Sequence, residues 1–111
     1  MRVIGSDLSQ AKGWYCGPWD STLEVSVGYA HQGIDEPHLH RSIHEIYCVA
    51  RGSAVVRVEG ERVRLEQGQV LVVEPGEAHT FVSSSADYMH FVIQAPGLRG
   101  EEARADKVLL P

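Results

Sequence analysis

The chain has 111 residues, of which 43% are hydrophobic and 23% are charged, and its formal net charge is −5. This length allows one domain with a modest core and leaves no room for a second domain. The acidic balance argues against nucleic acid as a partner, because the sequence has no basic stripe to neutralise phosphates. No apolar run is long enough for a signal peptide or a membrane span, so a cytoplasmic protein without a membrane partner is expected.

Residues 1–22 are predicted to form an N-terminal arm with an aromatic loop, Trp14–Trp19, that Gly and Pro interrupt. This region holds Cys16, one of the two cysteines of the chain, and the other is Cys48. Two cysteines do not make a disulfide framework in a protein of this kind, so both are expected to be reduced. A lid or substrate contact at Cys16 stays open at this point.

Residues 23–95 read as a series of short strands separated by turns that contain Gly, Pro or charged residues. Apolar and polar residues alternate over several of these runs, and no segment carries a long apolar period of 3.6 residues. About eight to ten short strands with turns at close spacing are typical of a barrel or a sandwich. The sequence therefore predicts an all-β fold with little helix.

Two of the expected strands, Ile46–Ala50 and Val70–Val73, are apolar on both faces. One face can fill the barrel, and the other needs cover from a second sheet or another subunit. Residues 96–111 form a charged tail with an apolar end, which is expected to pack on the barrel or on a dimer partner. A homodimer is the expected arrangement.

The residues best suited to chemistry lie between the turn at Gly33 and the apolar run that follows. His38 and His40 are two apart, so on a strand both imidazoles point to one side. Glu45 can join them if the chain bends once, whereas His44 would share their face in an unbroken strand. Imidazole and carboxylate ligands suit Zn, Fe, Mn, Ni or Cu better than Ca or Mg.

Two segments together carry a family resemblance. Residues 33–52 follow the pattern G-x4-H-x-H-x4-E-x6-G, which resembles the first motif of the cupin superfamily with one residue fewer between the Gly and the first His. Residues 68–79 follow G-x6-P-G-x2-H, which resembles the second motif. The ordered pair is specific although each motif alone is common. Glu74 and Ser83 depart from the usual Pro and Asn, and neither is a metal position.

This resemblance implies a double-stranded β-helix, or jelly-roll barrel, over residues 23–95. It also implies one divalent transition metal per chain, Fe, Mn, Ni, Cu or Zn, bound by His38, His40, Glu45 and His79. The family pattern requires a break in register over residues 41–43, which favours Glu45 over His44. Four protein ligands leave one or two positions open for water, a substrate oxygen or dioxygen.

The leading hypothesis is a metal-dependent enzyme acting on a small organic substrate inside the barrel, with dioxygenase chemistry first and isomerase or lyase chemistry next. Glu45 is a candidate proton shuttle, and Tyr47 and His90 are further candidate catalytic residues. A purely structural, hydrogen-bonded role is the alternative for a lone strand histidine such as His31 or His90. There are two competing functions. The protein is a non-catalytic sensor of a small molecule or a metal, or it holds a metal that only stabilises the barrel.

Overall fold

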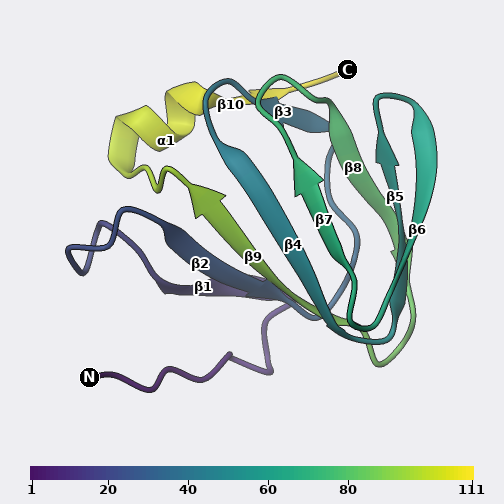
Figure 1. The fold of residues 1–111 in the computed structure, drawn as a ribbon, viewed down its shortest axis with the longest axis horizontal. Helices are drawn as coiled ribbons and strands as arrows, with labels where there is room; N and C mark the ends of the chain where they lie inside the picture. Colours follow the sequence, from purple (N-terminus) through teal and green to yellow (C-terminus); the bar gives the residue numbers. More distant parts are fainter.

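The structure, a computed structural model, describes residues 1–111 as two five-stranded antiparallel sheets that face each other (Figure 1). Sheet A has the strand order β1-β2-β9-β4-β7, and sheet B has the order β10-β3-β8-β5-β6. The elements, in chain order, are β1 (Lys12–Cys16), β2 (Ser26–Ala30), β3 (His38–His40), β4 (His44–Arg51), β5 (Ser53–Val58), β6 (Glu61–Glu66), β7 (Val70–Val73), β8 (His79–Ser84), β9 (Met89–Ala95), α1 (Gly100–Asp106) and β10 (Lys107–Leu109). The prediction of an all-β jelly-roll with little helix is confirmed.

The core lies between the two sheets and follows from the alternation of side chains along each strand. In β4, Glu45, Tyr47 and Val49 are buried and point inward, while Ile46 and Cys48 between them are half-buried on the outside. The main apolar cluster contains Tyr47, Val49, Ala54, Val56, Leu65, Val73, Phe81 and Tyr88. Complete burial of one such side chain, as at Val56, stabilises the fold by about 1.5–3 kcal/mol.

The first strand lies within residues 1–22, which are predicted to form an arm with an aromatic loop. Lys12–Cys16 pairs with β2 at the edge of sheet A, with a register shift between Trp14 and Cys16. Aromatic residues favour a pleated, half-buried surface, and here they outweigh the nearby Gly and Pro. The irregular loop begins only after Cys16, where the Trp19 ring packs onto Gly17.

The C-terminal segment also contains regular structure, seen in yellow at the top of Figure 1. Ala, Glu and Arg favour helix in residues 100–106, and Glu101 and Glu102 lie in its first turn, where negative charge is favourable. At seven residues this helix, the only one in the chain, is far too short to span a lipid bilayer. The following strand β10 pairs with β3, with Lys107 opposite His40. The tail therefore covers the sheet edge that carries two of the candidate ligands.

Sheet A has an apolar outer face. This is expected because β4 and β7 carry apolar residues on both of their faces. Two rows of paired residues cross it: Val27, Ile93, Ile46 and Val72 in one, and Tyr29, Phe91, Cys48 and Val70 in the other. The residues of the edge strand β7 are the least covered, with Val70 57% and Val72 54% exposed. We call these two rows the outer face of sheet A.

Candidate metal centre

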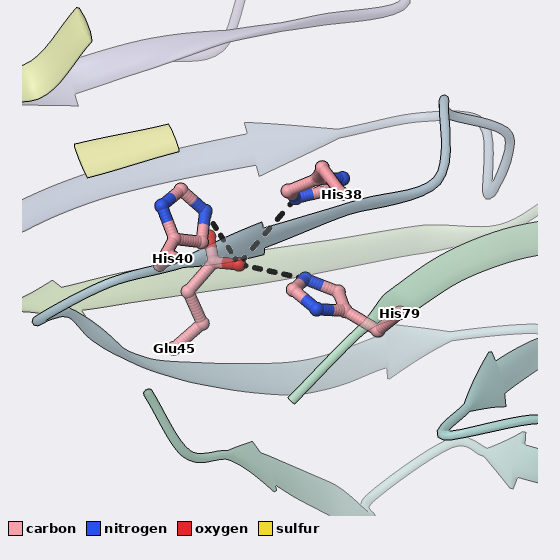
Figure 2. Close-up of side chains that lie close together, drawn as sticks. All are labelled: His38, His40, Glu45 and His79. Carbon is pink, nitrogen blue, oxygen red and sulfur yellow. Dashed lines mark hydrogen bonds and ion pairs between the residues drawn. The ribbon is translucent and has the colours of Figure 1, made fainter. Parts of the chain in front are cut away.

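Three strands bring the four predicted ligands to one point (Figure 2). His38 and His40 lie on β3, Glu45 on β4 and His79 on β8, and His38 is paired directly with His79 across the two strands. A bend at residues 41–42 separates β3 from β4 and shifts the alternation by one position. Glu45 is therefore buried and faces the histidines, while His44 is exposed.

The ligand atoms of His38, His40, Glu45 and His79 all lie within 4.8 Å of one another. The Glu45 Oε1 atom is 2.9 Å from Nε2 of His79, 3.1 Å from Nε2 of His40 and 3.9 Å from Nε2 of His38. All four side chains are buried. Three imidazole nitrogens thus converge on one buried carboxylate oxygen.

The other ring nitrogen of each histidine faces an acceptor that fixes its tautomer. Nδ1 of His38 and Nδ1 of His79 lie 2.7 Å and 3.0 Å from the backbone carbonyls of residues 36 and 77. Nδ1 of His40 lies 2.8 Å from Oδ2 of Asp106. Because carbonyl and carboxylate oxygens only accept, each Nδ1 carries the hydrogen. In the neutral rings, all three Nε2 lone pairs then point at the centre of the cluster.

This tautomer assignment tests whether the residues fit a metal. Three nitrogen lone pairs and a carboxylate oxygen at a single point are all acceptors and repel one another unless a cation lies between them. Hydrogen bonds from Nδ1 to carbonyl or carboxylate oxygens are the usual support of metal-binding histidines. The three imidazoles and one carboxylate therefore fit a divalent transition metal.

Electrostatic interactions within the cluster are strong. Burial opposes the charged form of Glu45, but hydrogen bonds from the three imidazoles, which can donate to it only when they carry a second proton, outweigh burial and hold the pKa of this carboxyl far below its usual range. Burial also opposes the charged form of His40, yet hydrogen bonds with Glu45 and Asp106 raise its pKa above the ordinary value. The site thus keeps a carboxylate that attracts positive charge.

Two further side chains hold Glu45 in place. The Tyr47 hydroxyl donates to Oε1 of Glu45 over 2.9 Å, and the amide nitrogen of Gln94 donates to Oε2 over 3.0 Å. Burial and the Glu45 charge raise the pKa of Tyr47 well above its ordinary value, so this phenol keeps its proton. Gln94 is not among the residues that the sequence singled out. It is placed by the register of β4 and β9, which pairs it with Glu45.

A cavity of about 790 Å³ between the two sheets leads to the cluster. His38, His40 and Glu45 line it, as do Tyr47 and His90, the other two candidate catalytic residues. His79 does not line this cavity. The cavity therefore gives a small molecule access to three of the four candidate ligands.

Other candidates lie away from the cluster, and one important partner was missed. His31 contacts Ser6 and the carbonyl of Gln10 near the surface. Cys16 and Cys48 are free thiols, and Cys48 points outward. Asp106, which supports His40, lies in the segment predicted as a charged tail. The sequence offers only a general reason to look for such a residue. A metal-binding histidine usually donates its second ring nitrogen's hydrogen to an acceptor, but no local pattern shows which residue that acceptor is.

Comparison with solved structures shows the same fold in several proteins. KdgF from Halomonas sp. superposes with a TM-score of 0.68 at 22% identity, over 87% of this chain and 88% of its own. A variant of Pac13 from Streptomyces with uridine gives a TM-score of 0.71 at 13% identity, over 99% and 92%, and Pac13 is described as a nucleoside dehydratase. A Cupin 2 conserved barrel protein from Salinispora arenicola CNS-205 gives 0.68 at 14%, over 86% and 88%. At these identities the likeness shows the fold alone.

Sequence comparison gives the family. No curated protein sequence matches the chain. The profile of the cupin domain family, Cupin_2, matches residues 25–94, well over half of the chain. This stretch contains both motifs and all four candidate ligands, on the fold expected for them. The chain belongs to the cupin domain family.

Proposed function

We propose that this cupin is a metal-dependent enzyme acting on a small organic molecule held between its two sheets. The observation that carries the proposal is the cavity of about 790 Å³ lined by His38, His40 and Glu45. A structural zinc site is closed by its four protein ligands, whereas a catalytic site keeps a position open to substrate. Access from this cavity to the buried cluster favours the catalytic arrangement.

His38, His40, Glu45 and His79 would hold one divalent transition metal per chain, with Fe, Mn, Ni, Cu and Zn as candidates. Such an ion, when bound, supplies Lewis-acid chemistry and, for the redox-active metals, electron transfer. The protein's own groups hold the carboxylate in position through Tyr47 and Gln94. Glu45 is the candidate proton carrier, because it is the one acid–base group with an oxygen at the centre of the cluster.

Dioxygenase chemistry, in which both oxygen atoms of dioxygen enter the substrate, is the first reaction class to test. Three imidazoles and a carboxylate suit the redox-active metals that this chemistry needs. Isomerase or lyase chemistry comes next, since a Lewis-acid metal and a carboxylate base can move a proton beside a carbonyl. The described activity of Pac13, dehydration of a nucleoside, is of the lyase type and supports keeping this class.

A non-catalytic binding or sensor protein is the second candidate function. One observation favours it. The cavity is large enough to hold a small molecule, whether or not the protein then converts that molecule. Tight ligand binding without turnover would distinguish it from an enzyme.

Element-resolved metal analysis of untagged protein is the first test, with His40→Ala beside the wild type. The matched control is His44→Ala, which removes an exposed imidazole four residues away. We expect about one transition metal per chain in the wild type and the control, and none in His40→Ala. Fe, Mn, Cu or Ni would lead to oxygen-consumption assays, and Zn to isomerase and lyase assays. No metal in the wild type would contradict the proposal.

We also propose that two copies associate through the outer face of sheet A. Val70 and Val72 are more than half exposed beside half-buried Ile46 and Ile93, and such a contiguous apolar face is typical of a protein interface. Sedimentation velocity should give a dimer for the wild type and a monomer for Val72→Glu. Arg64→Glu, an exposed change on sheet B, should stay dimeric. A monomeric wild type at 100 µM would contradict this arrangement.

A cytoplasmic location accords with the two free cysteines, since thiols persist in a reducing compartment.

A further inference from the structure

His90 forms a polar contact point on the cavity wall, away from the ligand cluster. It lies on β9 in an inward-facing row with Ala30 of β2 and Val49 of β4. It lines the cavity and is only 5% exposed. The rings of Tyr47 and Phe81 lie beside it, each with its centroid 5.0 Å from that of the imidazole. The ring is therefore held between aromatic neighbours.

The second feature is the partner of His90, Tyr88, which is 1% exposed. The Tyr88 hydroxyl lies 2.6 Å from Nδ1 of His90 and has no other hydrogen-bond partner. If Nδ1 carried the hydrogen, the phenol hydrogen would be buried with no acceptor, which costs more than an oxygen with a free lone pair. Burial raises the pKa of Tyr88 above its ordinary value, so that hydrogen stays in place. Tyr88 is therefore the donor, and the hydrogen of His90 lies on Nε2.

Nε2 of His90 has no partner within the protein. Ser26 Oγ is the only fully buried side-chain nitrogen or oxygen without a partner, so Nε2 of His90 must be in contact with open space. The space beside this ring is the cavity. Burial, opposed by the Glu45 charge, lowers the pKa of His90 to about 4. At pH 7 the ring is thus neutral and presents one N–H group to the cavity.

We propose that His90 donates this Nε2–H to an oxygen atom of the bound organic molecule, and that Tyr88 is a positioning residue that fixes the donating tautomer. The inference deepens the proposed function by adding a second contact point, so the molecule carries an accepting oxygen (carbonyl, hydroxyl or carboxylate) in addition to the group that faces the ligand cluster. A neutral imidazole can polarise such an oxygen without giving up its proton in the resting state.

Histidine tautomers are read directly by long-range ¹H–¹⁵N NMR on Zn²⁺-loaded protein labelled with ¹⁵N-histidine. We expect the Nε2–H form for His90 in the wild type and in Tyr15→Phe, a control that removes a phenol outside the cavity. Tyr88→Phe should shift His90 toward a mixture of tautomers. An Nδ1–H form in the wild type, or no change in Tyr88→Phe, would overturn the inference.

Contact with a ligand is tested by titrating the same protein with hydroxyacetone, a small neutral carbonyl compound. His90→Phe keeps a ring of similar shape and should weaken binding about three- to tenfold, as expected for one hydrogen bond. His90→Gln, which restores an N–H donor, should recover part of the affinity. Equal affinity in the wild type and His90→Phe would overturn the contact. If Zn²⁺ does not bind, the proposed function fails while the tautomer is still measured on the metal-free protein.

An independent observation concerns the only two lysines of the sequence, Lys12 and Lys107. Both line the cavity, although they come from edge strands of opposite sheets. Residues that are paired across two strands lie on the same face of the sheet. Lys107 is paired with His40, which faces the cavity. Lys12 is paired with Ala30, which is in turn paired with the inward-facing His90. Both side chains therefore belong to the inward faces, and both are exposed at the rim.

Neither lysine makes an ion pair. Among the acidic side chains that line the cavity, Asp35 is engaged by Thr80 and the backbone N–H of Phe81, and Glu45 belongs to the cluster. Only Glu36 remains without a side-chain partner at the rim. A chain of net charge −5 thus places both of its lysines at one opening. We infer that the molecule bound in the cavity is an organic anion, with its negatively charged group at Lys12 and Lys107.

Pyruvate and hydroxyacetone differ mainly in charge, so the pair tests this inference on Zn²⁺-loaded protein. We expect the double variant Lys12→Met/Lys107→Met to weaken pyruvate binding about three- to tenfold, because exposed charge pairs are individually weak. Hydroxyacetone binding should not change. Arg57→Met, which removes one positive charge from an exposed position of β5, should leave pyruvate affinity intact. Equal losses for both probes, or an equal loss in Arg57→Met, would overturn the inference.

Discussion

Two regions contribute to the metal centre in different ways: the strands that carry the ligands, and the C-terminal segment 100–110. His38 and His79 begin β3 and β8, and their Nδ1 atoms are held by carbonyls two residues earlier in the chain. His40 relies instead on Asp106, which lies 66 residues further along the chain. Asp106 is itself held by the backbone N–H and hydroxyl of Ser42. Two of the three imidazoles are thus oriented locally, and the third depends on the tail.

The two cupin motifs contain all four ligands, but one of these ligands needs a supporting residue that lies outside the motifs. The motifs supply the ligand atoms and local support for two of them. The support of His40 depends on α1 ending at Asp106 and on β10 pairing with β3. Variants of ligands and of supports should therefore have effects of different size.

Removal of a ligand should have the largest effect. His79→Ala leaves three ligands and an unpaired carboxylate, so we expect metal affinity to fall by more than about 100-fold, beyond the range of supporting partners. Competition with a fluorescent zinc chelator measures this loss. His44→Ala should bind as the wild type does. A loss below tenfold in His79→Ala would exclude it as a ligand.

Loss of the distant support should come next. Asp106→Asn offers one oxygen where the structure uses two, so it cannot serve both His40 and Ser42. We expect metal affinity to fall about 10- to 100-fold in the same chelator assay. Glu101→Gln, on the exposed side of the same helix, is the control. Wild-type affinity in Asp106→Asn would show that His40 needs no support from the tail.

Loss of a hydrogen bond to Glu45 should have a smaller effect. Tyr47→Phe removes a hydroxyl that donates to Oε1 but keeps the aromatic packing of the core. One such bond to a charged group corresponds to about a 10-fold change in affinity. Isothermal titration with Zn²⁺ provides the measurement. A change above 100-fold would place Tyr47 among the essential groups and would blur the distinction between ligand and support.

A core substitution should leave the metal centre unchanged. Val56→Ala removes buried methyl groups from the apolar cluster and should lower the free energy of unfolding by about 2 kcal/mol. Urea unfolding measures this change, and metal content should stay at the wild-type level. Loss of metal from the folded variant would show that packing and ligand geometry are not separable.

Much of this architecture could be predicted because the signals are local. Alternation in strands such as β6 and the Gly–Pro turns indicated an all-β fold, and the two motifs brought together His38, His40, Glu45 and His79. The choice between Glu45 and His44 could not come from the residues alone, because it depends on the bend at residues 41–42. The family resemblance decided it.

The remainder depends on long-range pairing. Gln94 reaches Glu45 through the register of β9 on β4, and Asp106 reaches His40 through the pairing of β10 with β3. No local pattern marks either residue. The Gly in Lys12–Cys16 and the Gly–Pro pair that follows it predict a loop, whereas the aromatic residues of this segment form a strand once β2 is available for pairing. The seven residues of α1 are too few to show a helical period.

The pairing of Asp106 with His40 also sets an order of events during synthesis. At about 5–20 residues per second, a ribosome makes Asp106 roughly 3–13 s after His40. From the addition of His79 onward, the nascent chain contains all four ligands but still lacks the group that orients one of them. Stable metal loading in the cell should therefore follow the synthesis of Asp106 and the pairing of β10 with β3.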